Sequence, residues 1–253
     1  DIDEYDEFKT WDIGDIVGIK GKLFRTKTDE LTIHANQAVL ITKSLKPMPE
    51  KHQGLKDVET RYRQRYLDLM SNNQTKHLFI KRSKIIDSIR SSMKAGEYME
   101  VETPMMHTLP GGAVARPFIT KHNALSRDLY LRIAPELHLK RLLVGGFNNV
   151  FEINRSFRNE GLSTKHNPEF TMLEFYSAYA SLQKIMDFVS SIIQNAALDI
   201  DINIDSVIWN NNSFNLKTFK QQTMRESIIA HNSDLKIEDL KDIKVQQNFL
   251  AAK

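Results

Sequence analysis

The sequence predicts an α+β fold in which an antiparallel sheet flanked by helices follows an incomplete β-barrel. Three observations support this fold class. Residues 16–43 alternate apolar and polar side chains between turn residues, which is typical of short strands. Residues 76–95 repeat apolar side chains at helical spacing. Residues 150–179 form two apolar-rich arms joined by a charged loop, which predicts a pair of strands.

Composition excludes several classes of protein. With 253 residues the chain can bury a large core in one or two domains. It has no cysteine, which excludes a disulfide framework and a thiolate metal site. The net charge of +3 permits nucleic-acid binding without arguing for it. No apolar run is long enough to span a membrane, and the acidic start, residues 1–11, does not resemble a signal peptide. We therefore expect a cytoplasmic protein with no membrane partner.

The chain begins with strands and a connecting region. Residues 16–25, 31–36 and 38–43 are predicted to form three strands, too few to close a small barrel. Residues 1–45 therefore look like the C-terminal part of an OB-fold. Residues 46–72 are predicted to be a linker, marked by Pro47, Pro49 and Gly54, and then a helix over 57–71 that Asp57 caps.

Residues 73–253 alternate helices and strands. The long helix over 76–95 is predicted to lead into a short strand over 98–101 that ends at Thr103-Pro104. Pro135 suits the first turn of a helix that the glycine pair 145–146 ends. The remaining predictions are a hairpin of 118–122 with 129–133, the strands 150–158 and 169–179, a helix over 182–198, strands and turns over 199–219, and short helices over 224–231 and 237–243.

The eleven-residue loop 159–169 and its flanks carry the chemistry. Loops of this length between strands are usually functional. Arg158 offers a fork of donors to phosphate or carboxylate oxygens, His166 can add a donor near phosphate, and Phe170 can stack on a base. The groups that could hold an amine are Glu160, Glu174 and Tyr176. This set suits a nucleotide plus an amino acid, although an exposed hairpin with ordinary ion pairs fits the composition equally well.

Several segments resemble one family. FRNEG, residues 157–161, followed by HNPEFTMLEFY, residues 166–176, resembles motif 2 of class II aminoacyl-tRNA synthetases in the lysyl, aspartyl and asparaginyl subgroup. EYMEVETPMM, residues 97–106, resembles motif 1, except that Glu97 stands where the family usually has glycine. PGGAVARPF, residues 110–118, and APELHLK, residues 134–140, are similar to the lysyl form of bacterial type.

The resemblance implies a lysine–tRNA ligase, which activates lysine with ATP to lysyl-adenylate and transfers it to the 3′ end of tRNA(Lys). It also implies a homodimer through motif 1. Arg158 would be the catalytic residue, bridging the substrate carboxylate and the α-phosphate of ATP. The other ATP-binding residues would be Glu160, His166, Asn167 and Phe170, and the lysine-binding residues would be Gly112, Glu136, Glu174 and Tyr176. Glu136 has a second interpretation, because a carboxylate at a helix start also complements the helix dipole.

The family's motif 3, a glycine-rich strand with a helix bearing an arginine, is not found. All ten glycines lie at or before Gly161, and Arg225 is the one arginine after Arg158. We therefore expect residues 73–253 to be the N-terminal part of the catalytic domain, the chain to be truncated at both ends, and the fragment to be inactive alone. Ligands for Mg²⁺ are expected in the missing C-terminal part, with no metal site here. Two alternatives stay open: a ligase that lysylates a translation factor, and a non-catalytic remnant that binds RNA or dimerises.

Overall fold

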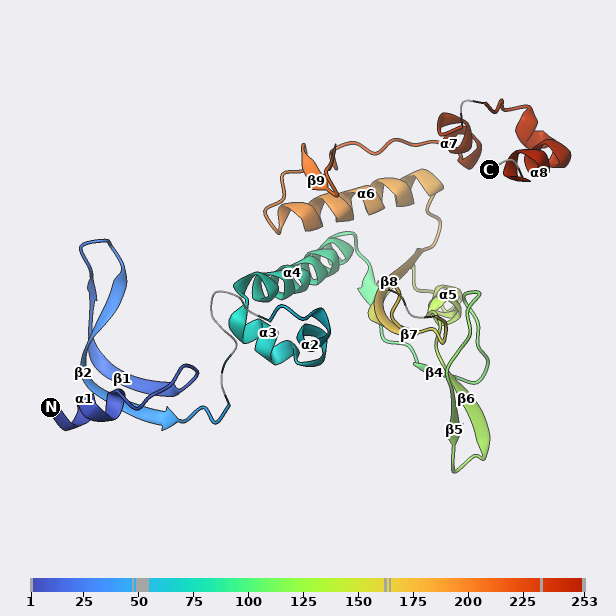
Figure 1. Cartoon of the computed structure of the whole chain (residues 1–253). Helices are drawn as coiled ribbons and strands as arrows, with labels where there is room; N and C mark the ends of the chain where they lie inside the picture. The colour runs from blue at the N-terminus through green and yellow to red at the C-terminus, as the bar shows by residue number, and fades with distance from the viewer. Residues whose placement is uncertain are drawn as a thin grey trace. The chain divides into compact units, whose positions relative to one another are not determined.

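The computed structural model describes residues 2–46, 48, 55–161, 163, 165–232 and 234–251. The chain divides into two compact units, Asp1–Lys81 and Arg82–Lys253. Helices and antiparallel strands occur in both, which confirms the α+β class (Figure 1). The predicted linker residues Pro47, Pro49 and Gly54 lie outside the described residues. None of the described helices is long and apolar enough to cross a membrane.

The first unit holds a two-stranded antiparallel hairpin of β1 (Ile16–Arg25) and β2 (Leu31–Thr42), preceded by the unpredicted helix α1 (Ile2–Phe8). The prediction of two strands over 31–43 was wrong, because β2 is continuous. The register passes from Lys20 opposite Gln37 to Gly21 opposite Ala35, so Asn36 is the extra residue of a bulge. Polar Asn36 therefore marks an irregularity inside a strand and not its end. The assignment of this hairpin to an OB-fold stays a prediction.

The predicted helix over 57–71 is broken in two. Asp57 caps α2 (Val58–Arg63), since its side chain accepts a hydrogen bond from the Thr60 N–H at 2.7 Å. Gln64 then leaves the helical region, with φ −119° and ψ 58°, before α3 (Arg65–Ser71) begins. The break lets α3 bury Asp68, whose carboxylate binds Arg65 at 2.6 Å.

The long helix α4 (Asn73–Ala95) ends in a Schellman motif with an unusual residue at its critical position. The Tyr98 N–H donates to the Met93 carbonyl and the Glu97 N–H to the Lys94 carbonyl, both at 3.0 Å. Glu97 has φ 64°, the left-handed conformation that glycine adopts most easily. The glycine next to it serves packing instead, since a Cβ on Gly96 would lie 2.7 Å from the Phe188 ring.

The main sheet of the second unit has the order β3-β7-β8. Strand β3 (Met99–Glu100) runs parallel to β7 (Asn149–Phe157), which pairs antiparallel with β8 (Glu169–Ser177). Helices α4 and α6 (Leu182–Leu198) supply the other side of the core, in which Tyr98 stacks on Phe188 with ring centroids 5.1 Å apart. The buried centre of this core comprises Met93, Tyr98, Phe151 and Ile192. The predicted strands and the helix over 182–198 are confirmed.

A second sheet has the order β4-β6-β5. Its strands come directly before helix α5 (Glu136–Val144) in the chain (Figure 1). Its strands are β4 (Met106–His107), β5 (Ile119–His122) and β6 (Arg127–Leu131). The predicted hairpin is confirmed, although β6 ends earlier than residue 133. Pro135 and Gly145 flank α5 as expected.

The C-terminal part is built from short elements. Strands β9 (Val207–Trp209) and β10 (Asn212–Phe214) are joined by Asn210 and Asn211, both with positive φ, as a two-residue hairpin turn requires. Helix α7 (Met224–Ala230) is confirmed, with a capping box of Thr223 and Glu226. The predicted helix over 237–243 was wrong: only a 3₁₀ turn, η1 (Asp239–Lys241), forms there, and the unpredicted helix α8 (Ile243–Ala251) follows it.

A fully buried ion pair connects the two three-stranded sheets of this unit. Arg132, just after β6, lies 2.6 Å from the Glu152 carboxylate on β7, and the two side chains are 0% and 1% exposed. Arg132 also donates to the Arg155 carbonyl at 2.7 Å. The Thr103 hydroxyl donates to Glu152 at 2.6 Å, so the segment after β3 joins the same network. Buried charges need such partners because desolvation is costly.

Replacing Glu97 by glycine should stabilise the chain by up to about 1 kcal/mol, because a left-handed conformation strains residues that carry a Cβ. Gly96→Ala should destabilise it, since the new methyl group would meet the Phe188 ring. Urea denaturation followed by circular dichroism measures both changes. A Glu97→Gly variant that is less stable than the wild type would contradict the backbone strain assigned to Glu97.

Replacing Arg132 by methionine should cost roughly 3–5 kcal/mol of unfolding free energy, because the Glu152 charge would stay buried and unpaired. Arg155→Met is the matched control. Its guanidinium lies 3.3 Å from Glu169 with both side chains about half exposed, so its loss should cost roughly 1 kcal/mol or less. Equal losses of unfolding free energy in the two variants, measured by urea denaturation, would show that the buried network stabilises the fold no more than an exposed ion pair does.

Candidate functional site

A cavity of about 460 Å³ opens at the loop end of the β7–β8 hairpin. All five residues predicted to bind ATP line it, together with Gly161, Lys165 and Pro168. Lys165 is a further cation of this cavity, at a position for which the sequence predicted no role. The cavity joins cations, a carboxylate, an amide and an aromatic ring within one loop, as an anionic aromatic ligand requires.

Arg158 is held on the aromatic ring of this cavity. Its guanidinium carbon lies 5.2 Å from the centroid of the Phe170 ring. The backbone N–H of Arg158 donates to the Pro168 carbonyl at 2.9 Å. The Arg158 Nε is buried without a hydrogen-bond partner among the described atoms. Buried donors are almost always paired, so this nitrogen has the capacity for one more acceptor. An oxygen of an anionic ligand would supply it.

His166 is oriented by Ser163. The Ser163 Oγ lies 2.8 Å from the His166 Nδ1, and the two backbones exchange hydrogen bonds of 3.3 and 3.2 Å. These contacts occupy one ring nitrogen and leave Nε2 to face a ligand. The neighbouring residues Leu162 and Thr164 lie outside the described residues.

The four residues predicted to bind lysine gather around α5 and β8. The Tyr176 hydroxyl donates to the Glu174 carboxylate at 2.6 Å. A Cβ on Gly112, which has φ +90°, would lie 3.1 Å from the Glu136 Cβ, so this glycine brings the 110–118 loop against α5. Glu136 pairs with Lys140 at 2.6 Å. Sequence reasoning missed Lys140, although the spacing of four residues on a helix is the signal for such a pair.

Burial and like charge act on the acidic groups of this pocket. Burial, with a smaller contribution from the Glu136 charge, raises the pKa of Glu174, while the Tyr176 hydrogen bond and Lys140 oppose the rise. Burial and the bond to Glu174 raise the pKa of Tyr176 far above its ordinary value, so it stays a neutral donor. A cationic ligand would relieve the mutual repulsion of the two carboxylates.

The two halves of the candidate site share one face of β8. Phe170, Glu174 and Tyr176 are separated by even numbers of residues, and side chains of a strand alternate between its faces. At about 3.3 Å per residue, the α-carbons of Phe170 and Tyr176 are on the order of 20 Å apart along the strand. One extended ligand, with a nucleotide at one end and an amino acid at the other, fits this arrangement.

Comparison with known proteins agrees with this geometry. The family of tRNA synthetases class II (D, K and N) matches residues 57–249. The chain belongs to this family. Its relatives include lysine–tRNA ligases of Salmonella paratyphi B, Salmonella newport and Salmonella enteritidis, each 53% identical over 249 residues. The match covers 98% of this chain and 48% of each relative, so the chain spans about half the length of the curated relatives it matches.

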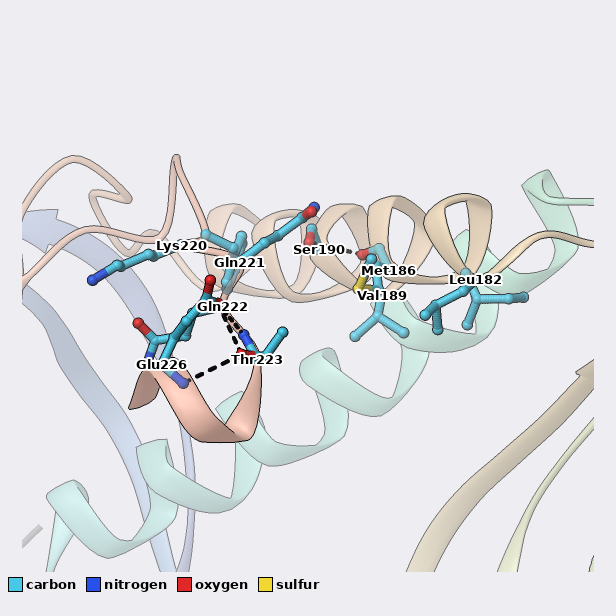
Figure 2. A pocket seen from close by; sticks show the side chains of 11 residues that line it. Leu182, Met186, Val189, Ser190, Lys220, Gln221, Gln222, Thr223 and Glu226 are labelled. Atoms are coloured by element: carbon cyan, nitrogen blue, oxygen red, sulfur yellow. Dashed lines mark hydrogen bonds between the residues drawn. The ribbon is translucent and has the colours of Figure 1, made fainter. Parts of the chain in front are cut away.

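A second cavity of this class II synthetase chain has a different character. It has a volume of about 770 Å³ and lies between α6 and the segment 219–226 (Figure 2). Its α6 side is mainly apolar, as Leu182, Met186 and Val189 show, and three of its polar side chains, Ser190, Thr223 and Glu226, bond within the chain. Thr223 and Glu226 bond to each other, and the Ser190 hydroxyl donates to the Met186 carbonyl. The charged cavity of the hairpin is therefore the better candidate site in a member of this family.

No group of three or more histidines and carboxylates that could hold a metal ion is found in the described part of this class II chain. The carboxylates Glu136 and Glu174 are accompanied by Lys140 and Tyr176, and the neighbouring carboxylate of Glu152 is already paired with Arg132. This set fits an ammonium better than a magnesium ion, which prefers several oxygen ligands. We therefore assign no magnesium ligand to these residues.

Replacing Glu174 by glutamine should remove a pH dependence of stability. Because burial raises the Glu174 pKa above its ordinary value of 4.5, the folded chain binds this proton more tightly than the unfolded chain. The associated stability is present below pH 4.5 and is lost as the pH rises through the raised pKa. The unfolding free energy of the variant, relative to that of the wild type, should therefore increase as the pH rises above 4.5. Urea titrations at several pH values measure this difference. A difference that is constant with pH would refute the assignment.

Proposed function

We propose that this chain is part of a lysine–tRNA ligase, which uses ATP to activate lysine and transfers it to tRNA(Lys) in the cytoplasm. The family match and the 53% identity to lysine–tRNA ligases support the class of reaction. The carrying observation is that one face of β8 holds Phe170, whose ring Arg158 contacts, and Glu174, whose carboxylate feels the charge of Glu136 on α5. This arrangement is what a site for a joined lysine and adenylate requires.

The first half-reaction is an attack of the lysine carboxylate on the α-phosphorus of ATP. A bond forms between a carboxylate oxygen and the α-phosphorus, and the bond from that phosphorus to the bridging oxygen of pyrophosphate breaks. The carboxylate is already ionised at neutral pH, so no general base is needed. The protein has to align the reactants and stabilise the charge that develops on the α-phosphate oxygens.

Arg158 performs both tasks in this proposal. Its fork would donate to the substrate carboxylate and to an α-phosphate oxygen, bringing the nucleophile and the phosphorus together. The unpartnered Nε and the position on the Phe170 ring support this role. Phe170 would also stack on adenine, with Glu160 and Asn167 at the adenine end and the His166 Nε2 toward the terminal phosphates.

The lysine end of the site would select a cationic amino acid. Glu136 and Glu174 provide negative charge, and Tyr176 holds the Glu174 carboxylate in place by a hydrogen bond of 2.6 Å. The Gly112 main chain would take the α-amino group. An amino acid without a second ammonium would leave a partly buried carboxylate unpaired, which disfavours its binding.

The proposal includes a homodimer through the motif 1 segment. In support, β3 is an edge strand of its sheet in the described residues, and Leu78 and Ile80 on α4 are exposed. Edge strands and exposed apolar residues are common sites of association. Sedimentation equilibrium of the chain tests this part of the proposal.

The decisive experiment is a calorimetric titration of the chain with a non-hydrolysable lysyl-adenylate mimic. Arg158→Ala should weaken binding by about tenfold to a hundredfold, the usual worth of hydrogen bonds to a charged group. Arg155→Ala is the matched control. It lies on β7, three residues before Arg158, and its side chain is on the face opposite to that of Phe170, so its loss should change binding by no more than about twofold.

An aspartyl-adenylate mimic serves as the specificity control, because the family also includes aspartate and asparagine enzymes. The wild type should bind it more weakly than the lysyl mimic, since its side-chain carboxylate would face Glu136 and Glu174. Equal binding of both mimics, or equal losses in both arginine variants, would contradict the proposed function.

A further inference from the structure

The pocket proposed for lysine already holds an ammonium group from the chain itself. The Lys140 Nζ lies 2.6 Å from the Glu136 Oε1. It also lies 5.6 Å from the centroid of the Tyr176 ring, so its charge is directed toward β8 and not only along α5. A lysine side chain therefore occupies the same acidic group that the substrate amine is expected to use.

The surroundings of Lys140 fit a replaceable counter-ion. Lys140 is 51% exposed and Glu136 is 30% exposed, so the ammonium can leave for solvent while the carboxylate stays in the pocket wall. The second oxygen of Glu136 makes no hydrogen bond among the described residues, which leaves it open to a ligand. Across the pocket, Glu174 and Tyr176 face the same charge, and Lys140 counteracts the rise of the Glu174 pKa.

We propose that Lys140 is an internal stand-in for the substrate ammonium, which neutralises Glu136 in the empty pocket and is displaced when the amino acid binds. This inference rests on the proposed function. An empty pocket with two facing carboxylates would be strained by their repulsion. Lys140 offsets part of that repulsion, and the substrate amine takes its place beside Glu136 when the amino acid binds.

The weakness of the pair makes the exchange possible. An exposed ion pair within one helix is worth at most about a fivefold change in an equilibrium constant. Displacing Lys140 therefore lowers lysine affinity by a factor of that size. If the pair only stabilised the helix, removing Lys140 would lower the affinity for lysine or leave it unchanged, because the change would only loosen α5 or leave the pocket as it is.

The test compares Lys140→Met with Lys140→Arg, which keeps the charge, by calorimetric titration with L-lysine and with the lysyl-adenylate mimic. The expected result is that Lys140→Met binds both ligands about two- to fivefold more tightly, while Lys140→Arg stays close to the wild type. Arg63→Met is the matched control. It removes a pair of the same spacing, Arg63 with Glu59 at 2.6 Å, from the other compact unit, and should leave affinity unchanged.

The outcomes separate this inference from the function on which it rests. Lys140→Met that binds as the wild type does, or more weakly, overturns the displacement while the lysine site stands. Binding of neither ligand by the wild type and all variants overturns the lysine pocket and the displacement with it. Lys140→Gln provides a second neutral variant, and circular dichroism shows whether each variant is folded.

Discussion

The buried ion pair of Arg132 and Glu152 is the constraint on which the arrangement of the second unit depends. Two charges without exposure must satisfy each other and their neighbours, because desolvation would otherwise exceed their attraction. Arg132 therefore also binds the Thr103 hydroxyl and the Arg155 carbonyl, and its own carbonyl accepts from Phe157 at 2.9 Å. The network fixes the ends of three segments relative to one another.

Those segments lead directly to the candidate site. Arg132 is followed within four residues by α5, which carries Glu136 and Lys140. Glu152 lies opposite Glu174 in the β7–β8 pairing, and Phe157 is followed by Arg158. The buried pair thus sets where the acidic pocket and the arginine fork stand on one sheet. Specific positions of this kind need a rigid support beneath them.

The candidate site has positive charge at one end and negative charge at the other. At the loop end, the cations Arg158, Lys165 and His166 surround a cavity suited to phosphate oxygens. Toward the other end of β8, two carboxylates and a tyrosine suit an amine. Phe170 at one end and Glu174 and Tyr176 at the other lie on the same face of β8, which suits a single extended ligand that carries both charges.

The sequence by itself determined the family and the main elements of the second unit. Apolar periodicity located β7, β8, α4 and α6, and the FRNEG and HNPEF segments singled out residues that the structure brings together in one cavity. These features are local, because a motif or the apolar face of a helix depends on residues that are close together in the sequence. Tertiary structure alone decided that Arg132 pairs with Glu152, that Lys140 approaches the ring of Tyr176, and that Asn36 is the extra residue of a bulge. It also showed that Glu97 takes the left-handed position while Gly96 makes room for Phe188. Such choices depend on groups distant in the chain, whose burial and charge become defined only when the strands and helices pack.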